Sequence, residues 1–510
     1  MSKRALAEPS AAQPERGRAD EPRVEEDGMG EFEDAFEDEI ESDEGEVVDM
    51  ADEGMEIDGV PVHGKIQELD EDEEEEAPTE AYMPGHKPLP EGHTLVPDQS
   101  AYHMLHRMNV TWPCLSFDFL QDHMGAQRQA FPHSAFLVTG TQADVAKNNE
   151  VLVMKASSMH RTSKDDDLSD EEDDDDDVDE DAVLEYRSIP TLGGVNRVRA
   201  APTSTPTSDL EPCLDPYPVA TWSETGKVPI WDIRPLYNVL QSPGTTLDKK
   251  KAHTPLFTVE AHRGVEGYAM DWGGILGGGS SGKGGHLRLL TGDVHSKIFL
   301  TTSNNTGFTT HAAPFESHTS SVEDLQWSPS EPTVFASCSA DRSIRIWDVR
   351  VKSHRSALAV DGAHDQDVNV ISWNRGTQYL LLSGGDEGAL KVWDMRNFKA
   401  QDGAPSPVAH FEWHQGPISS VEWHPDEDSI FAASGRDDQV TLWDLGVERD
   451  EDEDASQLPK GPNGEPVPSQ LLFCHHGASE IKEVHWHRQI PGMLGSTSAD
   501  GFHFFKTISV

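Results

Sequence analysis

The sequence is poor in cysteine and contains no long apolar run. Its 510 residues include four cysteines, Cys114, Cys213, Cys338 and Cys474, which lie far apart and form no Cys-x-x-Cys pair. This spacing argues against a disulfide framework or a zinc site, and favours buried thiols in a reducing compartment. No apolar run of about 18 residues and no signal peptide are found. We therefore expect a soluble, intracellular protein without membrane attachment.

Signatures of catalysis and nucleotide binding are missing as well. The sequence has no P-loop, no Gly-x-Ser-x-Gly, no His-Glu-x-x-His and no Gly-rich nucleotide loop. We therefore predict a binding scaffold that is not an enzyme and uses no cofactor and no metal.

Positive charge is scarce, since 40 basic residues stand against 93 acidic ones and the formal net charge is −53. The excess is concentrated in residues 1–95, with 32 acidic and 7 basic residues, and in residues 165–181, with 14 acidic and no basic residues. Such segments cannot bury enough apolar surface to offset the entropy of ordering. We predict a disordered acidic tail over residues 1–95, a disordered acidic insert over residues 160–182 and an acidic loop over residues 448–470.

This charge predicts a basic protein as partner. Binding to duplex nucleic acid depends on Lys and Arg displacing counterions, so direct nucleic-acid binding is not expected. A basic protein is attracted to the acidic tract at long range. Ser169, three residues before Glu172, is a candidate site for an acidophilic kinase. The partner-binding residues predicted in the tract are Asp173, Asp174, Asp175, Asp176 and Asp177.

Three repeats in register organise the second half of the chain. Each has a His, an inner Trp, an Asp in a tight turn and a closing Trp-Asp pair, and the His-to-Asp spacings are 23, 22 and 23 residues. Alternating apolar residues between these positions predict strands, and the whole pattern is the WD-repeat signature of a propeller blade. Because an active site is unique rather than repeated, we expect each Asp to cap its turn and bond its His. The structural residues are His318, Asp341, Trp347, His364, Asp386, Trp393, His414, Asp437 and Trp443.

Weaker copies of the repeat raise the count to seven. One contains His262, Trp272 and Asp293 with Phe299 in place of the closing Trp, and the last contains His476, Trp486 and Asp500 with Phe504 near its end. Two more are expected over residues 195–232 and 115–155. The predicted fold is therefore all-β, a seven-bladed WD-repeat β-propeller over residues 113–510.

A helix is predicted over residues 96–112. Ala101, Met104, Leu105 and Met108 are spaced as one apolar stripe, and Asp98 or Ser100 can cap its start. Either the helix seals blade edges, or it forms one wall of a partner groove. On the second interpretation its partner-binding residues are Tyr102, Leu105 and Met108.

The blade register also predicts which residues surround the mouth of the central channel. In each repeat, the residue four positions before the inner Trp should open onto one rim of the ring. An ordinary polar rim is the alternative to a docking site. The partner-binding residues predicted there are Asn196, Tyr268, Glu323, Asn369, Ser419 and Lys482.

Several of these segments resemble the glutamate-rich WD-repeat family. The resemblance covers roughly residues 80–510 and is carried by residues 113–118, the acidic tract before Val183, and residues 321–329, 335–341, 343–348, 367–373, 431–435 and 506–510. It implies that the chain is similar to a fungal member that is the dedicated chaperone of large-subunit ribosomal protein L-three, acting in the nucleus and nucleolus. More distantly, the chain is similar to histone-binding WD-repeat chaperones, which hold a basic peptide at positions resembling Asn196, Tyr268, Glu323 and Asn369.

The resemblance and the charge together predict a dedicated chaperone for newly made protein L-three in 60S subunit biogenesis. It would shield the positive charge of this client and deliver it to pre-60S particles, as a monomer in the nucleus and nucleolus with a cytoplasmic pool. Two alternatives remain open. One is a histone-binding chaperone or chromatin adaptor, and the other is a substrate receptor of a cullin-type ubiquitin ligase. The second alternative is suggested by Trp-Asp-x-Arg at residues 231–234, 347–350 and 393–396.

Overall fold

The structure is a computed structural model that describes residues 97–162, 181–202, 215–242, 244–274, 286–399, 405–448, 460–461, 464 and 466–510. The chain divides into two units, Met1–Pro78 and Thr79–Val510, and every described residue lies in the second. The predicted tail over residues 1–95, most of the predicted insert and most of the predicted acidic loop lie outside the described residues. Within the described ranges, no helix has the length and apolar character needed to span a bilayer.

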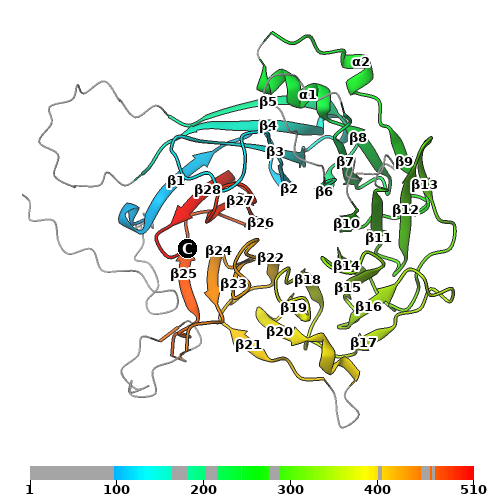
Figure 1. Cartoon of the computed structure of the whole chain (residues 1–510), viewed down its shortest axis with the longest axis vertical. Helices are drawn as coiled ribbons and strands as arrows, with labels where there is room; N and C mark the ends of the chain where they lie inside the picture. Colours follow the sequence, from blue (N-terminus) through cyan, green and yellow to red (C-terminus); the bar gives the residue numbers. More distant parts are fainter. Residues whose placement is uncertain are drawn as a thin grey trace, which may run out of the picture. The chain divides into compact units, whose positions relative to one another are not determined.

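Seven antiparallel four-stranded sheets form blades around a central channel (Figure 1). From the inner to the outer strand, blade 1 contains β2 (Cys114–Leu120), β3 (His133–Thr141), β4 (Glu150–Met159) and β5 (Val183–Pro190); blade 2 contains β6 (Val195–Ala200), β7 (Pro218–Ser223), β8 (Val228–Asp232) and β9 (Phe257–Val259). Blade 3 contains β10 (Ala269–Gly273), β11 (Arg288–Gly292), β12 (Ile298–Asn304) and β13 (Gly307–Thr310); blade 4 contains β14 (Val322–Trp327), β15 (Val334–Ser339), β16 (Ile344–Asp348) and β17 (Leu358–Val360).

The remaining blades follow the same order. Blade 5 contains β18 (Val368–Trp373), β19 (Leu380–Gly385), β20 (Ala389–Asp394) and β21 (Ala409–Glu412); blade 6 contains β22 (Ile418–Trp423), β23 (Ile430–Gly435), β24 (Gln439–Asp444) and β25 (Leu471–His475); blade 7 contains β26 (Glu483–Trp486), β27 (Met493–Ser498), β28 (Gly501–Thr507) and β1 (Tyr102–Met108). Each inner strand contacts the inner strand of the next blade, and β26 contacts β2, so the ring is closed. The predicted seven-bladed propeller is therefore confirmed.

Helical segments are short in the described part of the chain. The structure has α1 (Arg234–Gln241) and α2 (Lys249–Ala252), together with single 3-10 turns η1 (Gln99–Ala101), η2 (Ala146–Asn148) and η3 (Met395–Lys399). Pro235 stands in the first turn of α1, where its missing N–H is not needed. The apolar face of α1 packs on blade 1, with the Tyr237 ring centroid 4.6 Å from that of Phe136.

The helix predicted over residues 96–112 is wrong. Asp98 does accept a hydrogen bond from the Ser100 backbone N–H at 3.0 Å, but it caps only the three-residue turn η1. The chain then continues as β1, which pairs antiparallel with β28 and completes blade 7. The open edge of β28 decides the outcome, because a strand added there gains a full ladder of backbone hydrogen bonds.

The side chains of β1 show why the sequence was ambiguous. Tyr102, Met104 and Met108 are all buried, but the pairing with β28 skips a residue after Tyr102, so only Met104 and Met108 share one face of the strand. Met104 and Met108 are also four residues apart, which fits one face of a helix. A seven-residue apolar segment therefore satisfies both periodicities.

In blades 4, 5 and 6, the His and closing Trp residues of the repeat belong to one hydrogen-bonded chain. In blade 4, Trp347 Nε1 donates to Ser337 Oγ at 2.7 Å, this oxygen lies 2.6 Å from His318 Nε2, and His318 Nδ1 lies 3.0 Å from an Asp341 carboxylate oxygen. Blade 6 repeats the arrangement, with His414 Nδ1 2.9 Å from Asp437 and with Thr441 in the place of the serine.

Blade 5 corrects one predicted pair. His364 Nδ1 lies 2.5 Å from Glu387 Oε1, so Glu387 and not Asp386 is its partner. The remaining links are unchanged, because Ser383 Oγ lies 2.7 Å from His364 Nε2 and accepts from Trp393 Nε1 at 2.8 Å. Counted to Glu387, the His-to-carboxylate spacing in blade 5 is 23 residues, the same as in blades 4 and 6, so the prediction chose an acid one position too early.

Blades 3 and 7 close differently from the prediction. In blade 4, the residue two strands outward from Trp327 is Trp347. In blade 3, the residue two strands outward from Trp272 is Thr301 rather than Phe299. Phe299 is nevertheless buried, and its ring lies edge-on to His262 at 4.8 Å.

In blade 7, the residue two strands outward from Trp486 is Phe505 rather than Phe504. The Phe505 ring stacks on His475, with centroids 4.2 Å apart. His475, on β25 of blade 6, also lies with its Nδ1 2.8 Å from the Tyr102 hydroxyl, so β1 is bonded to blade 6 through a side chain and to β28 through its backbone.

Candidate functional site

The rim predicted from the sequence is built from a repeated irregularity in the inner strands. In β2, β6, β14, β18 and β22, the pairing skips one residue directly after the first residue of the strand. Such a bulge turns the skipped side chain away from the sheet. The skipped residues are Leu115, Asn196, Glu323, Asn369 and Ser419. Tyr268 and Lys482 stand directly before β10 and β26, at the corresponding positions.

Contacts between blades bring these six predicted residues to one end of the channel. Asn196 Nδ2 donates to the Gly267 carbonyl at 3.4 Å, next to Tyr268. Asn369 Nδ2 donates to the Ile418 carbonyl at 3.1 Å, next to Ser419.

Polar partners already engage two of the rim side chains. Ser419 Oγ lies 2.9 Å from Ser434 Oγ, within the same blade. Lys482 Nζ forms an ion pair with Glu480 at 3.0 Å. These contacts leave the acidic and aromatic members as the better candidates for partner binding.

A group of three carboxylates stands at the rim between blades 4 and 5, and we call Glu323, Asp367 and Asp386 the rim acids. Burial raises the pKa of Glu323, and the nearby charges of Asp367 and Asp386 raise it further. Burial and Asp386 also raise the pKa of Asp367. Asp386 accepts a hydrogen bond from Asn369 Nδ2 at 2.8 Å. Among the described residues, none of the three forms an ion pair, so the group can accommodate an external cation.

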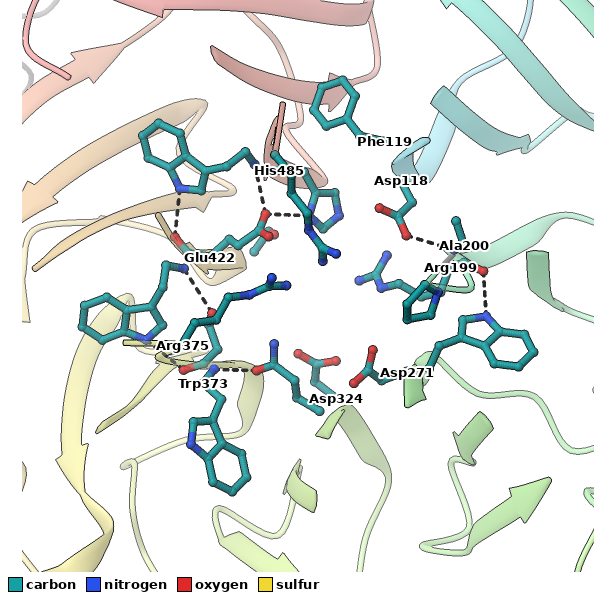
Figure 2. Close-up of a pocket in the computed structure, with 18 of the residues that line it drawn as sticks. Asp118, Phe119, Arg199, Ala200, Asp271, Asp324, Trp373, Arg375, Glu422 and His485 are labelled. Carbon is teal, nitrogen blue, oxygen red and sulfur yellow. Dashed lines mark hydrogen bonds and ion pairs between the residues drawn. The ribbon is translucent and has the colours of Figure 1, made fainter. Parts of the chain in front are cut away.

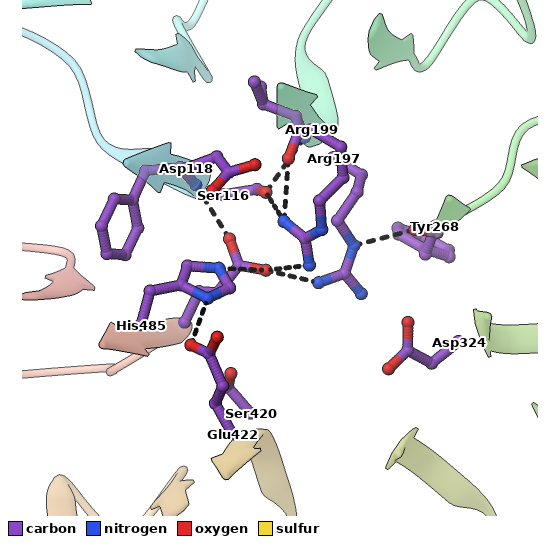
Figure 3. A network of polar contacts seen from close by, with 12 residues as sticks. Ser116, Asp118, Arg197, Arg199, Tyr268, Asp324, Ser420, Glu422 and His485 are labelled. Carbon is purple, nitrogen blue, oxygen red and sulfur yellow. Dashed lines mark hydrogen bonds and ion pairs between the residues drawn. The ribbon is translucent and has the colours of Figure 1, made fainter. Parts of the chain in front are cut away.

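Beneath the rim, a buried glutamate joins three blades (Figure 3). Glu483 on β26 is 1 % exposed and accepts from Arg197 and Arg199 of β6, each at 2.7 Å. Its other oxygen accepts from the Phe117 backbone N–H at 2.8 Å. Although burial opposes ionisation, Arg199, His485 and Arg197 hold the pKa of Glu483 well below its ordinary value.

His485 extends this network to blade 6. Its Nδ1 lies 2.8 Å from Glu422 and its Nε2 lies 3.5 Å from Glu483. Burial alone would lower the pKa of His485, but the two carboxylates raise it to about 9. The imidazolium is therefore an ionised part of the ring at neutral pH.

Side chains one layer further along the channel bind the backbone of the next blade. Asp118 accepts from the Ala200 N–H at 2.9 Å, Asp271 from the Trp327 N–H at 2.7 Å and Glu422 from the Trp486 N–H at 3.0 Å. These bonds fix neighbouring inner strands in register, which is a structural use of polar groups.

A pocket of about 160 Å³ lies at the end of the inner strands opposite the rim (Figure 2). Its charged lining includes Asp118, Asp271, Asp324, Arg375 and Arg488. Burial raises the pKa of Asp271 to about 7, and it also raises the pKa of Asp324. The positive charge of Arg488 is the main reason that the pKa of Arg375 is lowered to about 10.

In the described part of the chain, no group of three or more His, Cys, Asp or Glu side chains is placed to hold a metal ion. Cys114 and Cys338 are buried, and burial raises the pKa of the Cys114 thiol to about 12. Cys213 lies outside the described residues.

The other predicted partner-binding residues are those of the helix and of the acidic tract. Tyr102 and Met108 are 3 % and 4 % exposed and seal blade 7, so they offer no docking surface, and Leu105 is only half-buried. The structure thus favours the edge-sealing interpretation of this segment. Ser169 lies outside the described residues, as does the predicted acidic tract Asp173–Asp177.

Sequence reasoning missed Asp367 and assigned Asp386 to the interior of its blade. It also missed the pair Arg197 and Arg199, whose partner Glu483 lies 286 and 284 residues away. Their alternation on β6, with both side chains directed to the channel, was the available signal.

The chain matches two family models. One, which describes the histone-binding protein RBBP4 and a component of the CAF1 complex, matches residues 92–160. The other, the "WD domain, G-beta repeat" model, matches residues 309–348, 356–394 and 405–444. The first covers β1 to β4, and the second covers β14 to β24.

Curated relatives match nearly the whole chain. "Ribosome assembly protein rrb1" of Schizosaccharomyces pombe is 45% identical over 94% of this chain and 93% of its own length. "Glutamate-rich WD repeat-containing protein 1" of Dictyostelium discoideum is 41% identical over 86% of each chain, and "Protein HEAT STRESS TOLERANT DWD 1" of Arabidopsis thaliana is 38% identical over 85% of this chain and 92% of its own length. This chain therefore belongs to the glutamate-rich WD-repeat family, together with ribosome assembly protein rrb1.

Proposed function

We propose that this protein acts in ribosome biogenesis as a chaperone of a newly made, basic ribosomal protein, with large-subunit protein L-three as the favoured client. The similarity to a protein named for ribosome assembly supports the process. The net charge of −53 and the unpaired rim acids support a basic client. In this role the protein works in the nucleus and nucleolus, with a cytoplasmic pool, delivers its client to pre-60S particles and catalyses no reaction.

The observation that carries the client chemistry is the group of rim acids. Three carboxylates that repel one another at the mouth of a rigid ring are stabilised when a Lys or Arg side chain is placed among them. Tyr268 is half-buried on the same rim, and burial raises the pKa of its hydroxyl, with Glu266 and Glu323 contributing. Rigid aromatic and charged residues of this kind usually carry most of the energy of a binding surface.

The rim and the acidic tract are expected to contribute differently. Solvated charges of the tract mainly speed encounter and are sensitive to salt. Neutralising Asp173–Asp177 should therefore slow association and flatten its salt dependence. Rim variants should instead speed dissociation, because they remove contacts made in the docked state.

The test is a kinetic comparison with the purified client at two salt concentrations. The rim variant Glu323→Gln/Asp367→Asn/Asp386→Asn keeps side-chain shape and removes only charge. The matched control is Glu331→Gln/Asp426→Asn/Glu427→Gln, which neutralises three exposed acids in the loops at the opposite end of the inner strands. We expect at least a tenfold faster dissociation for the rim variant and none for the control. Equal dissociation rates would show that the rim is not the docking site.

Histone binding is the second candidate, and a specific observation favours it. The match of residues 92–160 to the histone-binding family model covers β1, and "Histone-binding protein MSI1" of Saccharomyces cerevisiae is 32% identical over 36% of this chain. Affinity purification from growing cells separates the two, since recovery of core histones without a ribosomal protein would favour this candidate.

The geometry of the three Trp-Asp-x-Arg tetrapeptides gives little support to the alternative of a ligase substrate receptor. Arg350 and Arg396 each bind the Asp of their own tetrapeptide at 2.6 Å, and Arg234 is buried beside Tyr217 and Tyr237. The Arg side chains are thus used locally, which accounts for the motif without a ligase. Recovery of a ligase adaptor in the same purification would restore this alternative.

A further inference from the structure

The pocket opposite the rim contains charges of both signs that are left without ionic partners. Asp118, Asp271 and Asp324 accept only backbone hydrogen bonds from neighbouring strands. Arg375 and Arg488 stand on the loops after β18 and β26. In the described part of the chain, none of these five groups takes part in an ion pair.

This set contrasts with charged groups that line the same pocket but are matched, namely Arg197, Arg199, Glu422 and His485. Glu483 holds Arg197 and Arg199, and Glu422 holds His485. The fold is therefore able to neutralise buried charge where stability requires it. Charges left unmatched at a solvent-accessible cavity point to a ligand that supplies the partners.

The five groups without ion pairs are separated by sign, although Arg199, which Glu483 holds, also stands near the acids. The acids come from the inner strands of blades 1, 3 and 4, while the arginines come from loops of blades 5 and 7. Figure 2 shows the carboxylates of Asp271 and Asp324 and the side chain of Arg375 pointing into the pocket from different blades. Arg488 lies close to Arg375, and its positive charge is the main cause of the lowered pKa of Arg375.

Simple ions do not suit this arrangement. A phosphate or a free carboxylate attracted by Arg375 and Arg488 would meet the three acids, and an isolated ammonium group attracted by Asp271 and Asp324 would meet the two arginines. A ligand that carries both charges, a few ångströms apart, satisfies both groups at once. The cavity of about 160 Å³ is well below the roughly 300–1,000 Å³ of sites for drug-sized ligands, so it holds about one residue.

We propose that this pocket binds a C-terminal lysine or arginine of a peptide chain, with its free carboxylate between Arg375 and Arg488 and its side-chain cation at Asp271 and Asp324. The carboxylate gains charge-assisted hydrogen bonds to two guanidinium groups, and the cation relieves the repulsion between neighbouring carboxylates. The chain leading to the terminal residue leaves through the open mouth beside the exposed loop arginines. This site goes beyond the proposed function, because it lies at the other end of the channel from the rim acids.

Fluorescence polarisation with the full-length protein and labelled Gly-Gly-Lys peptides tests the proposal. The peptide with a free carboxylate is compared with the same peptide ending in a carboxamide and with Gly-Gly-Gln. Each change removes one of the two charges, and each should weaken binding by about tenfold, the cost of losing charge-assisted hydrogen bonds. N-acetyl-lysine with a free carboxylate should compete, whereas its carboxamide should not.

Protein variants assign the carboxylate to its partners. Arg375→Gln/Arg488→Gln should weaken the acid peptide about tenfold and leave the carboxamide peptide unchanged, since these arginines act only on the carboxylate. The matched control Arg350→Gln removes an exposed arginine that is bonded to its own Asp348, and it should bind all peptides as the wild type does. The rim variant described above should also leave this binding intact, which separates a failure here from a failure of the proposed function.

Two results would overturn the proposal. Equal affinity for the acid and carboxamide peptides would remove the role of the terminal carboxylate. Unchanged affinity of the double arginine variant, with circular dichroism and melting temperature like those of the wild type, would place the peptide elsewhere.

Discussion

Replacing Glu483 by glutamine should destabilise the ring, because this one carboxylate of blade 7 holds groups from blades 1 and 2. It binds Arg197, Arg199 and the Phe117 N–H at 2.7–2.8 Å and is 1 % exposed. The amide keeps the size of the side chain but carries no charge, and its NH₂ group is turned toward other donors. The guanidinium groups of Arg197 and Arg199 then stay buried without a negative charge to balance them at this position.

The expected cost follows from that geometry. Removing one partner of a buried, hydrogen-bonded ion pair typically costs about 3–5 kcal/mol. With an unfolding entropy of ~2.1 cal/mol/K per residue over the roughly 350 residues that the structure describes, this cost lowers the melting temperature by about 4–7 °C. Differential scanning calorimetry of the full-length protein measures the shift directly.

A matched control keeps the interpretation specific. Glu480 pairs with Lys482 at 3.0 Å on the surface, with its side chain 71% exposed, so Glu480→Gln should leave the melting temperature unchanged. An unchanged melting temperature for Glu483→Gln itself would refute the reasoning, since it would mean that the arginines are stable without this charge.

Three further predictions concern the closing tryptophan, the closing strand and pH. Trp347→Ala should cost about 3–5 kcal/mol, measured as a lower melting temperature, because a fully buried ring packed on Phe335 is removed. Tyr102→Phe should speed hydrogen exchange in β28, because the hydroxyl bond to His475 is lost. The pKa of His485 is raised to about 9, so the stability that its charged form contributes is complete below about pH 6.5 and is lost as the pH rises from 6.5 to 9. In the His485→Gln variant, the melting temperature should therefore depend less on pH over this range.

The sequence predicted the ring because its signals are local and repeated. His318, Asp341 and Trp347 lie within 30 residues, and their copies recur in register, so spacing alone identified the blades. The choice between two adjacent acids was the weak point. In blade 5 the partner of His364 is Glu387 rather than Asp386, although the 23-residue spacing of blades 4 and 6 already pointed to Glu387.

The closing strand could not be predicted from its own residues. A segment with both helical and strand periodicity takes the form that its surroundings favour, and the open edge of β28 lies about 400 residues further along the chain. The same limit applies to the candidate sites. The rim positions followed from blade register, whereas the rim acids and the pocket charges combine side chains from different blades.

Completion of blade 7 by β1 also has a consequence for the order in which this protein can be made. Until β28 has been synthesised, the segment containing Tyr102, Met104 and Met108 has no sheet to join, and its apolar side chains remain uncovered. Contacts between such distant strands form late, because the entropy of closing the long loop is lost before the stabilising hydrogen bonds can form. A nascent chain of this family would thus pass most of its synthesis as an open arc with an exposed apolar strand, and a protein proposed to protect others would itself need protection until the ring closes.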